Sequence, residues 1–151
     1  MTMSLDRRGV VAAGLTAGAA LAANSPARAQ AAKPPPRLSV FVLDTRRGRP
    51  ATGLKVDFSA KDGAAYKFVK TVTINATGNT DEPVFKAAEM ALGDYEFNLH
   101  VAEYYLGLGV KLPSRPFLNE VPIRFSIFDV DQVFHVPVLM TPWSYITYRG
   151  S

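Results

Sequence analysis

The sequence has 151 residues, a length that allows one domain, and it carries 17 Lys and Arg against 13 Asp and Glu. Because it contains no cysteine, a disulfide framework, a zinc ribbon, a thiolate iron–sulfur site and a cysteine nucleophile are excluded. Two histidines leave little room for a histidine-rich metal site. A charged fraction of 20% with 11% aromatic residues is too apolar for a disordered chain.

Residues 1–29 have the pattern of an export signal peptide. A pair of arginines at 7–8 precedes an apolar run at 10–23, and Ala-Arg-Ala at 27–29 supplies the small residues that a signal peptidase recognises. Paired arginines before a weakly hydrophobic run resemble a twin-arginine signal. The alternative is a transmembrane anchor, which needs about 20 apolar residues. We therefore expect cleavage after Ala29, a periplasmic or secreted protein and no stable membrane anchor.

Removal of this segment leaves 14 basic and 12 acidic residues, so the net charge falls from +4 to +2. The basic character that would favour nucleic acid as a partner therefore largely disappears. Residues 30–37 are rich in proline and lack apolar periodicity, which predicts an extended linker. The folded domain is expected over residues 38–151.

From Leu38 onward, apolar residues recur with the two-residue period of β-strands. The pattern runs through five segments: 38–42, 54–58, 95–99, 121–127 and 134–140. Turn residues separate them, among them the hairpin turn Asp62-Gly63. Regularly spaced short strands predict an all-β sandwich or barrel. A short helix is expected only at 103–109.

Several positions on the predicted outer faces are apolar: Phe41, Leu43, Phe128, Leu139 and Tyr145. A sandwich of this size with an apolar outer face usually covers that face with another subunit. The composition therefore favours an oligomer.

Several segments resemble the transthyretin family. The first is Leu-Ser-Val-Phe-Val-Leu-Asp-Thr at 38–45, followed by Gly-Arg-Pro-Ala at 48–51. Another is Phe-Leu-Asn-Glu-Val-Pro-Ile-Arg-Phe at 117–125. The C-terminal part runs from His-Val-Pro-Val-Leu at 135–139 through Pro-Trp-Ser-Tyr to the ending Thr-Tyr-Arg-Gly-Ser at 147–151. That ending resembles the 5-hydroxyisourate hydrolase branch, because the hormone-carrying transthyretins have lost it.

The resemblance covers residues 38–151 and implies a transthyretin-like, eight-stranded β-sandwich with one short helix. It also implies a homotetramer, a dimer of dimers around a central channel. In the hydrolase branch, active sites in that channel open a ring of 5-hydroxyisourate with water, on the route from urate to allantoin. The expected ligand is thus a small purine-derived molecule, and the family uses no cofactor or metal.

The resemblance assigns catalytic roles to four residues: His135, Tyr148, Arg149 and Ser151. Two further positions, both expected to bind substrate, depart from the family pattern. Phe41 stands where the family has a first-strand histidine, and Asn79 stands where it has an arginine after a turn glycine. The hormone carriers also replace both positions.

The chemistry shows what the two replacements change. Hydrolysis needs a base that activates water, and histidine suits that role near neutral pH. It also needs a donor or cation where negative charge collects on oxygen. Phe41 supplies neither, and Asn79 donates a hydrogen bond without charge.

Two hypotheses follow. The retained ending and His135 favour an exported hydrolase, weakened in activity. Phe41 and Asn79 favour a catalytically inactive, exported protein that binds a small ligand. A third hypothesis, an adhesion or scaffolding module, rests on the fold alone.

Each site residue also has a structural interpretation. His135 and Phe41 fit as ordinary strand residues, and Tyr148 with Arg149 would simply finish an edge strand. The other histidine, His100, is expected to be solvated.

Overall fold

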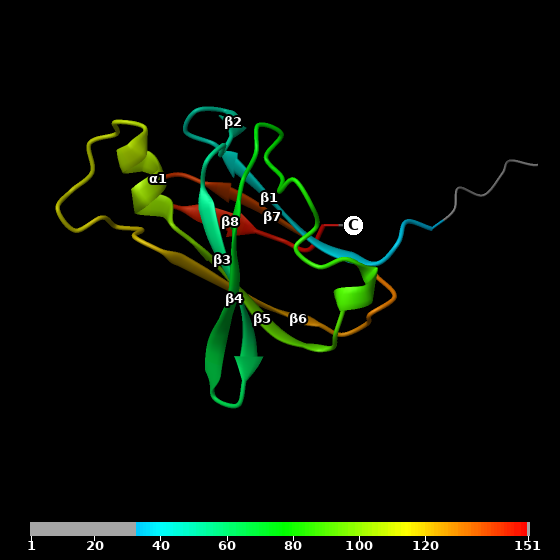
Figure 1. The fold of residues 1–151 in the computed structure, drawn as a ribbon. Coiled ribbons are helices and arrows are strands. Elements are labelled where there is room, and N and C mark those ends of the chain that lie inside the picture. Colours follow the sequence, from blue (N-terminus) through cyan, green and yellow to red (C-terminus); the bar gives the residue numbers. More distant parts are fainter. Residues whose placement is uncertain (1–32, 151) are drawn as a thin grey trace, which may run out of the picture. The chain divides into compact units, whose positions relative to one another are not determined.

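The computed structural model describes residues 33–150, so the predicted export signal and Ser151 lie outside the described residues. Two four-stranded sheets form a sandwich (Figure 1), with strand orders β2-β1-β7-β8 and β4-β3-β5-β6. The first sheet contains β1 Arg37–Asp44, β2 Arg49–Pro50, β7 Val133–Met140 and β8 Tyr145–Thr147. The second contains β3 Lys55–Asp62, β4 Ala65–Thr73, β5 Gly93–Leu99 and β6 Val121–Ile127. The expected all-β, eight-stranded sandwich is confirmed.

The helices are short. A single 3₁₀ turn, η1, spans Ala87–Glu89, and the α-helix α1 spans Val101–Gly107. The helix lies two residues earlier than the predicted 103–109, because Val101, Tyr104 and Tyr105 form its buried side at the i, i+3, i+4 spacing. No helix within residues 33–150 is long and apolar enough to cross a membrane.

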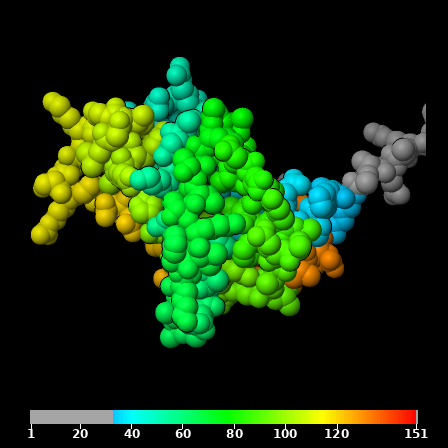
Figure 2. Space-filling view, viewed as in Figure 1, coloured from blue at the N-terminus to red at the C-terminus, as the bar shows by residue number. Residues whose placement is uncertain are grey.

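Strand β4 was not among the five segments identified from alternation. Most of its side chains are exposed, including Phe68 and Val69, so it lacks an alternating pattern. It is an edge strand, and the far end of the β3–β4 hairpin extends past the part of β3 that pairs with β5. Figure 2 shows this hairpin projecting from the body of the sandwich.

The core fills the space between the two sheets. From β1 it receives Leu38, Val40 and Val42, which are fully buried, whereas Ser39 and Phe41 lie on the outer face. Aromatic rings from the other sheet complete the core, with Phe58 stacked 5.5 Å from Tyr95. The two-residue period therefore sorts β1 into a core face and an outer face.

Strands β1 and β7 are parallel neighbours, although they come from opposite ends of the domain. Their register sets Ser39 opposite His135 and Phe41 opposite Pro137. Because alternate residues share a face, these four side chains lie on the outer face of the first sheet. The pairing thus brings together residues almost a hundred positions apart.

A buried carboxylate connects the helix to this sheet. Asp44, at the end of β1, is fully buried and accepts hydrogen bonds from the hydroxyls of Tyr105 at 2.8 Å and Tyr104 at 3.2 Å. The backbone N–H of Arg47 donates a third bond to it. Burial, together with the Asp44 carboxylate, raises the pKa of Tyr105, so its hydroxyl stays a donor.

We predict that Tyr105→Phe lowers the free energy of unfolding by about 1.5–3 kcal/mol, the range for hydrogen bonds to charged groups. The matched control is Tyr95→Phe, which removes a hydroxyl bonded to the backbone carbonyl of Ala91 and should cost only about 0.5–1.5 kcal/mol. Urea denaturation measures both. Equal losses of unfolding free energy in the two variants would show that the bond from Tyr105 to Asp44 is no stronger than a bond to a backbone carbonyl.

Candidate functional site

His135 lies half-buried on the outer face of β7. Its Nδ1 is 2.9 Å from the Oγ of Ser39 on the neighbouring strand β1. Its backbone carbonyl accepts a 2.8 Å hydrogen bond from the N–H of Gly150. His135 is therefore bonded through its side chain to β1 and through its backbone to the C-terminal segment.

An open hollow of about 480 Å³ lies beside this imidazole. Its lining residues come from β1, β7 and the C-terminal segment: Phe41, His135, Pro137, Tyr148, Arg149 and Gly150. The structure thus brings together four of the six predicted site residues. Ser151 follows Gly150 directly but lies outside the described residues.

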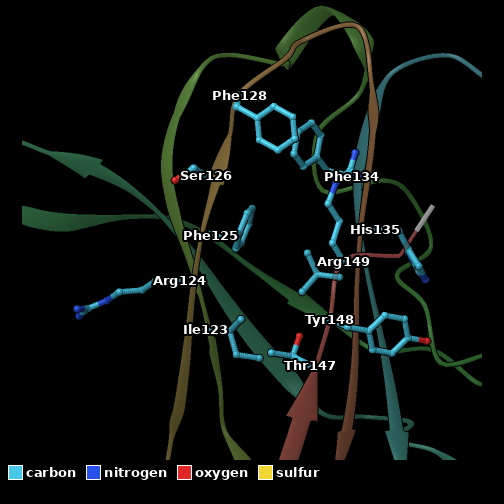
Figure 3. A pocket seen from close by; sticks show the side chains of 11 residues that line it. Ile123, Arg124, Phe125, Ser126, Phe128, Phe134, His135, Thr147, Tyr148 and Arg149 are labelled. Carbon is cyan, nitrogen blue, oxygen red and sulfur yellow. The ribbon is translucent and has the colours of Figure 1, made fainter.

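The side chain of Arg149 is directed along the edge of the sandwich. Its guanidinium lies 5.2 Å and 5.4 Å from the ring centroids of Phe134 and Phe128 and donates a 2.6 Å hydrogen bond to Oε1 of Gln132. Figure 3 shows Arg149 extending toward these two rings, whereas Tyr148 and His135 point to the other side. Arg149 therefore borders both this hollow and a smaller one of about 220 Å³.

Phe41 forms one wall of the larger hollow. Its ring centroid is 6.5 Å from that of His135, and the two planes meet at 44°. The ring also packs on Gly78, where an added Cβ would lie only 2.5 Å from a ring carbon. The carbonyl of Gly78 accepts a 2.8 Å bond from the N–H of Val42, so the turn before Asn79 lies directly against β1.

Asn79 does not line the hollow. Its side-chain amide nitrogen is 3.2 Å from the Oγ1 of Thr77. Its backbone carbonyl accepts a hydrogen bond from the backbone N–H of Asn75. The side chain therefore closes its own turn. The prediction that this position binds substrate remains a prediction.

The backbone of Gly150 lies beside the imidazole. A Cβ at this position would lie 2.7 Å from Cδ2 of His135 and 3.2 Å from Cγ of Pro137. A side chain at position 150 is therefore incompatible with the observed placement of the ring.

Burial lowers the pKa of His135, and the nearby cation of Arg37 lowers it further. The imidazole is consequently neutral near neutral pH and able to accept a proton. A neutral imidazole is able to act as a general base, and the aromatic side chains of Phe41 and Tyr148 line the same hollow and offer apolar surface to a flat ligand. Within residues 33–150, no three His, Asp or Glu side chains are arranged to hold a metal ion.

The expectation for His100 was wrong. It is half-buried, and its Nε2 lies 2.8 Å from Oδ2 of Asp57, whose other oxygen accepts a bond from Thr71. This cluster belongs to the second sheet and is separate from the hollow at His135.

Sequence reasoning missed two residues of the site, Ser39 and Gln132. Ser39 could have been found, because it lies two positions before Phe41 and therefore shares its face. Nothing in the sequence pattern marked Gln132.

We predict that Gly150→Ala displaces the His135 ring and breaks its contact with Ser39. Overpacking of this kind typically costs about 1–3 kcal/mol. Ring resonances in NMR spectra and thermal unfolding measure the two effects. The control is Gly107→Ala, where an added Cβ meets nothing within 4 Å. A Gly150→Ala protein with unshifted His135 resonances would contradict the prediction.

We also predict that the His135 ring titrates below its ordinary pKa of 6.5, so that the neutral form dominates at pH 7. Arg37→Gln should move the midpoint upward, yet leave it below 6.5, because burial is the larger cause. Native His135 then takes up its proton at lower pH than the unfolded chain, so stability falls as pH drops below 6.5. NMR titration measures the midpoint, with the exposed Arg115→Gln as control. A midpoint unchanged by Arg37→Gln would contradict the role of this cation.

Comparison with known proteins identifies one family over almost all of the described domain. The HIUase/Transthyretin family model matches residues 38–150. The chain is 47% identical over 115 residues to "5-hydroxyisourate hydrolase 2" of Rhizobium meliloti, covering 76% of this chain and 96% of that protein. It is 42% identical over 116 residues to "5-hydroxyisourate hydrolase" of Deinococcus radiodurans, covering 77% and 97%.

Two solved structures share the fold. The structure of Klebsiella pneumoniae 5-hydroxyisourate hydrolase matches with a TM-score of 0.63 and 29% identity, covering 76% of this chain and 99% of that one. The crystal structure of (S)-allantoin synthase matches with a TM-score of 0.72 and 33% identity, covering 79% of this chain. This chain spans 45% of the length of that protein. By its sequence and its fold, the chain belongs to the HIUase/Transthyretin family.

Proposed function

We propose that this protein is a 5-hydroxyisourate hydrolase, which opens a ring of its small purine-derived substrate by adding water. The observation that carries the proposal is the His135 imidazole, 2.9 Å from Oγ of Ser39, beside the hollow lined by Phe41 and Tyr148. The relatives at 42–47% identity, which carry the hydrolase name, support it over nearly their whole length.

In this reaction a water oxygen bonds to a ring carbonyl carbon while His135 accepts a proton from that water. The C–N bond of the cyclic amide then breaks, and the proton passes to the leaving nitrogen. Negative charge collects on the carbonyl oxygen during the attack and needs a donor or a cation. Tyr148 borders the hollow and carries a hydroxyl donor suited to that role, with Ser151 as a further member of the predicted group. Arg149 also borders the hollow, but its guanidinium lies on Phe128 and Phe134 and would have to turn to serve there.

Timed ring opening of freshly generated 5-hydroxyisourate tests the proposal, with the spontaneous reaction as baseline. The protein should accelerate the decay, and His135→Ala should remove the acceleration. The matched control is His100→Gln, which changes the other histidine, outside the hollow. A parent protein that leaves the decay at its spontaneous rate would refute the hydrolase assignment.

The second candidate is a binding protein without catalysis. Two observations favour it: Phe41 presents a ring instead of a base, and the Asn79 amide is engaged with Thr77. A purine-like ligand would then lie against Phe41 and stay unchanged. Calorimetric binding without any turnover would support this alternative.

If the two replaced positions limit the rate, Phe41→His combined with Asn79→Arg should raise turnover about 100-fold or more. Each added group needs to stabilise the transition state by a few kcal/mol, and ~1.4 kcal/mol corresponds to a tenfold change in rate. Neither single change should give the full gain, because groups that act together are non-additive. The ring-opening assay measures it. No gain from the double variant, in a parent as active as its relatives, would mean that His135 and the C-terminal ending suffice.

We propose that the active form is a homotetramer whose channel is bordered by Phe41, His135 and Ser151. Exposed apolar side chains on and beside the edge strand β8 support an interface: Trp143, Tyr145, Ile146 and Tyr148. Light scattering of the mature protein should give about four times the subunit mass. A monomer at micromolar concentration would exclude a shared channel.

We further propose that the protein acts in urate catabolism in the periplasm, after twin-arginine export and cleavage behind Ala29. The start of the family match at residue 38 supports a separate N-terminal segment. Mass spectrometry of the native protein should find it without residues 1–29, and an intact N-terminus in the cytoplasm would overturn the proposal.

A further inference from the structure

The contact between Ser39 and His135 links two strands in a fixed register. Eight consecutive residue pairs join β1 to β7, and Ser39 is the direct partner of His135 in that ladder. Both side chains are half-buried, and Oγ lies 2.9 Å from Nδ1. This geometry is that of a formed hydrogen bond, in which either atom can be the donor.

Among the described residues, Ser39 is the only side chain that hydrogen-bonds to the imidazole. The other neighbours with measured placement present apolar atoms: the ring of Phe41, and Gly150, which has no side chain beside Cδ2 of the imidazole. Arg37 on β1 is the cation whose charge acts on the imidazole. Ser39 is thus the group that can distinguish one ring nitrogen from the other.

We infer that Ser39 is a positioning residue: its Oγ accepts a hydrogen bond from Nδ1–H of His135 and so keeps Nε2 unprotonated for a water molecule that enters the hollow. The inference rests on the proposed hydrolase function, because a base needs a free lone pair at the nitrogen that reaches the water. The opposite polarity, with Ser39 donating to Nδ1, would place the proton on Nε2 and block that step.

The contact also fixes the orientation of the ring. Gly150 lies on the side of Cδ2, and the hydrogen bond restrains the ring on the side of Nδ1. Without the hydroxyl, the ring retains its packing but loses the group that selects its tautomer. A loss of this kind should lower kcat with little effect on KM, because substrate contacts remain.

Three variants of the full mature protein test the inference. Ser39→Ala should lower kcat roughly 3- to 10-fold, which is the rate equivalent of one neutral hydrogen bond. Ser39→Thr keeps the hydroxyl and should restore most of the rate. Thr71→Val is the matched control, because it removes a hydroxyl from the cluster of the other histidine, on the other sheet.

The ¹⁵N chemical shifts of the His135 ring provide a second readout that does not depend on turnover. The parent should show a protonated Nδ1 and an unprotonated Nε2, and Ser39→Ala should show a mixture of tautomers. A parent with the proton on Nε2 overturns the inference, as does Ser39→Ala with unchanged shifts. A parent without turnover refutes the proposed function instead, while the shifts still decide whether Ser39 sets the tautomer.

Discussion

The site depends on the parallel pairing of β1 with β7. The two strands come from opposite ends of the domain, and eight consecutive residue pairs hold them in register. A slip of one residue would turn His135 into the core and expose Val136, so the alternation of buried and outer side chains makes the register costly to change. The position of the imidazole relative to Ser39 and Phe41 is therefore set by the folding of the sandwich itself.

Backbone supplied by two other segments completes the site. The C-terminal segment reaches His135 through an isolated bridge at Gly150, and the turn at Gly78 packs under Phe41. In both places a glycine lets backbone approach an aromatic ring more closely than any Cβ would allow. At Gly150, which lines the hollow, the absence of a side chain leaves room for the imidazole. The position of Arg149, in contrast, is fixed by its own side-chain contacts. It stacks on Phe128 and Phe134 and bonds to Gln132, and these contacts direct its charge along the sandwich edge.

Much of the fold could be predicted from the sequence, because burial on one face produces a two-residue period in β1, β3, β5, β6 and β7. Strand β4 was not predicted, since an edge strand with both faces largely exposed has no such period. The grouping of Phe41, His135, Tyr148 and Arg149 came from resemblance rather than from spacing; the structure places these four residues around one hollow, and their roles stay predictions. The direction of the Arg149 side chain and the engagement of Asn79 with Thr77 depend on tertiary contacts that no local pattern records.

The packing of Phe41 on Gly78 makes these two positions dependent on each other over evolutionary time. Position 78 cannot gain a side chain while position 41 carries this ring, because the Cβ would lie 2.5 Å from it. The backbone of Gly78, with φ of +86°, adds a second barrier to substitution. A side chain at position 78 therefore requires the Phe41 ring to move or to be replaced by a smaller residue. The two positions are thus coupled, because a smaller residue at position 41 removes one of the two barriers and leaves the backbone barrier in place.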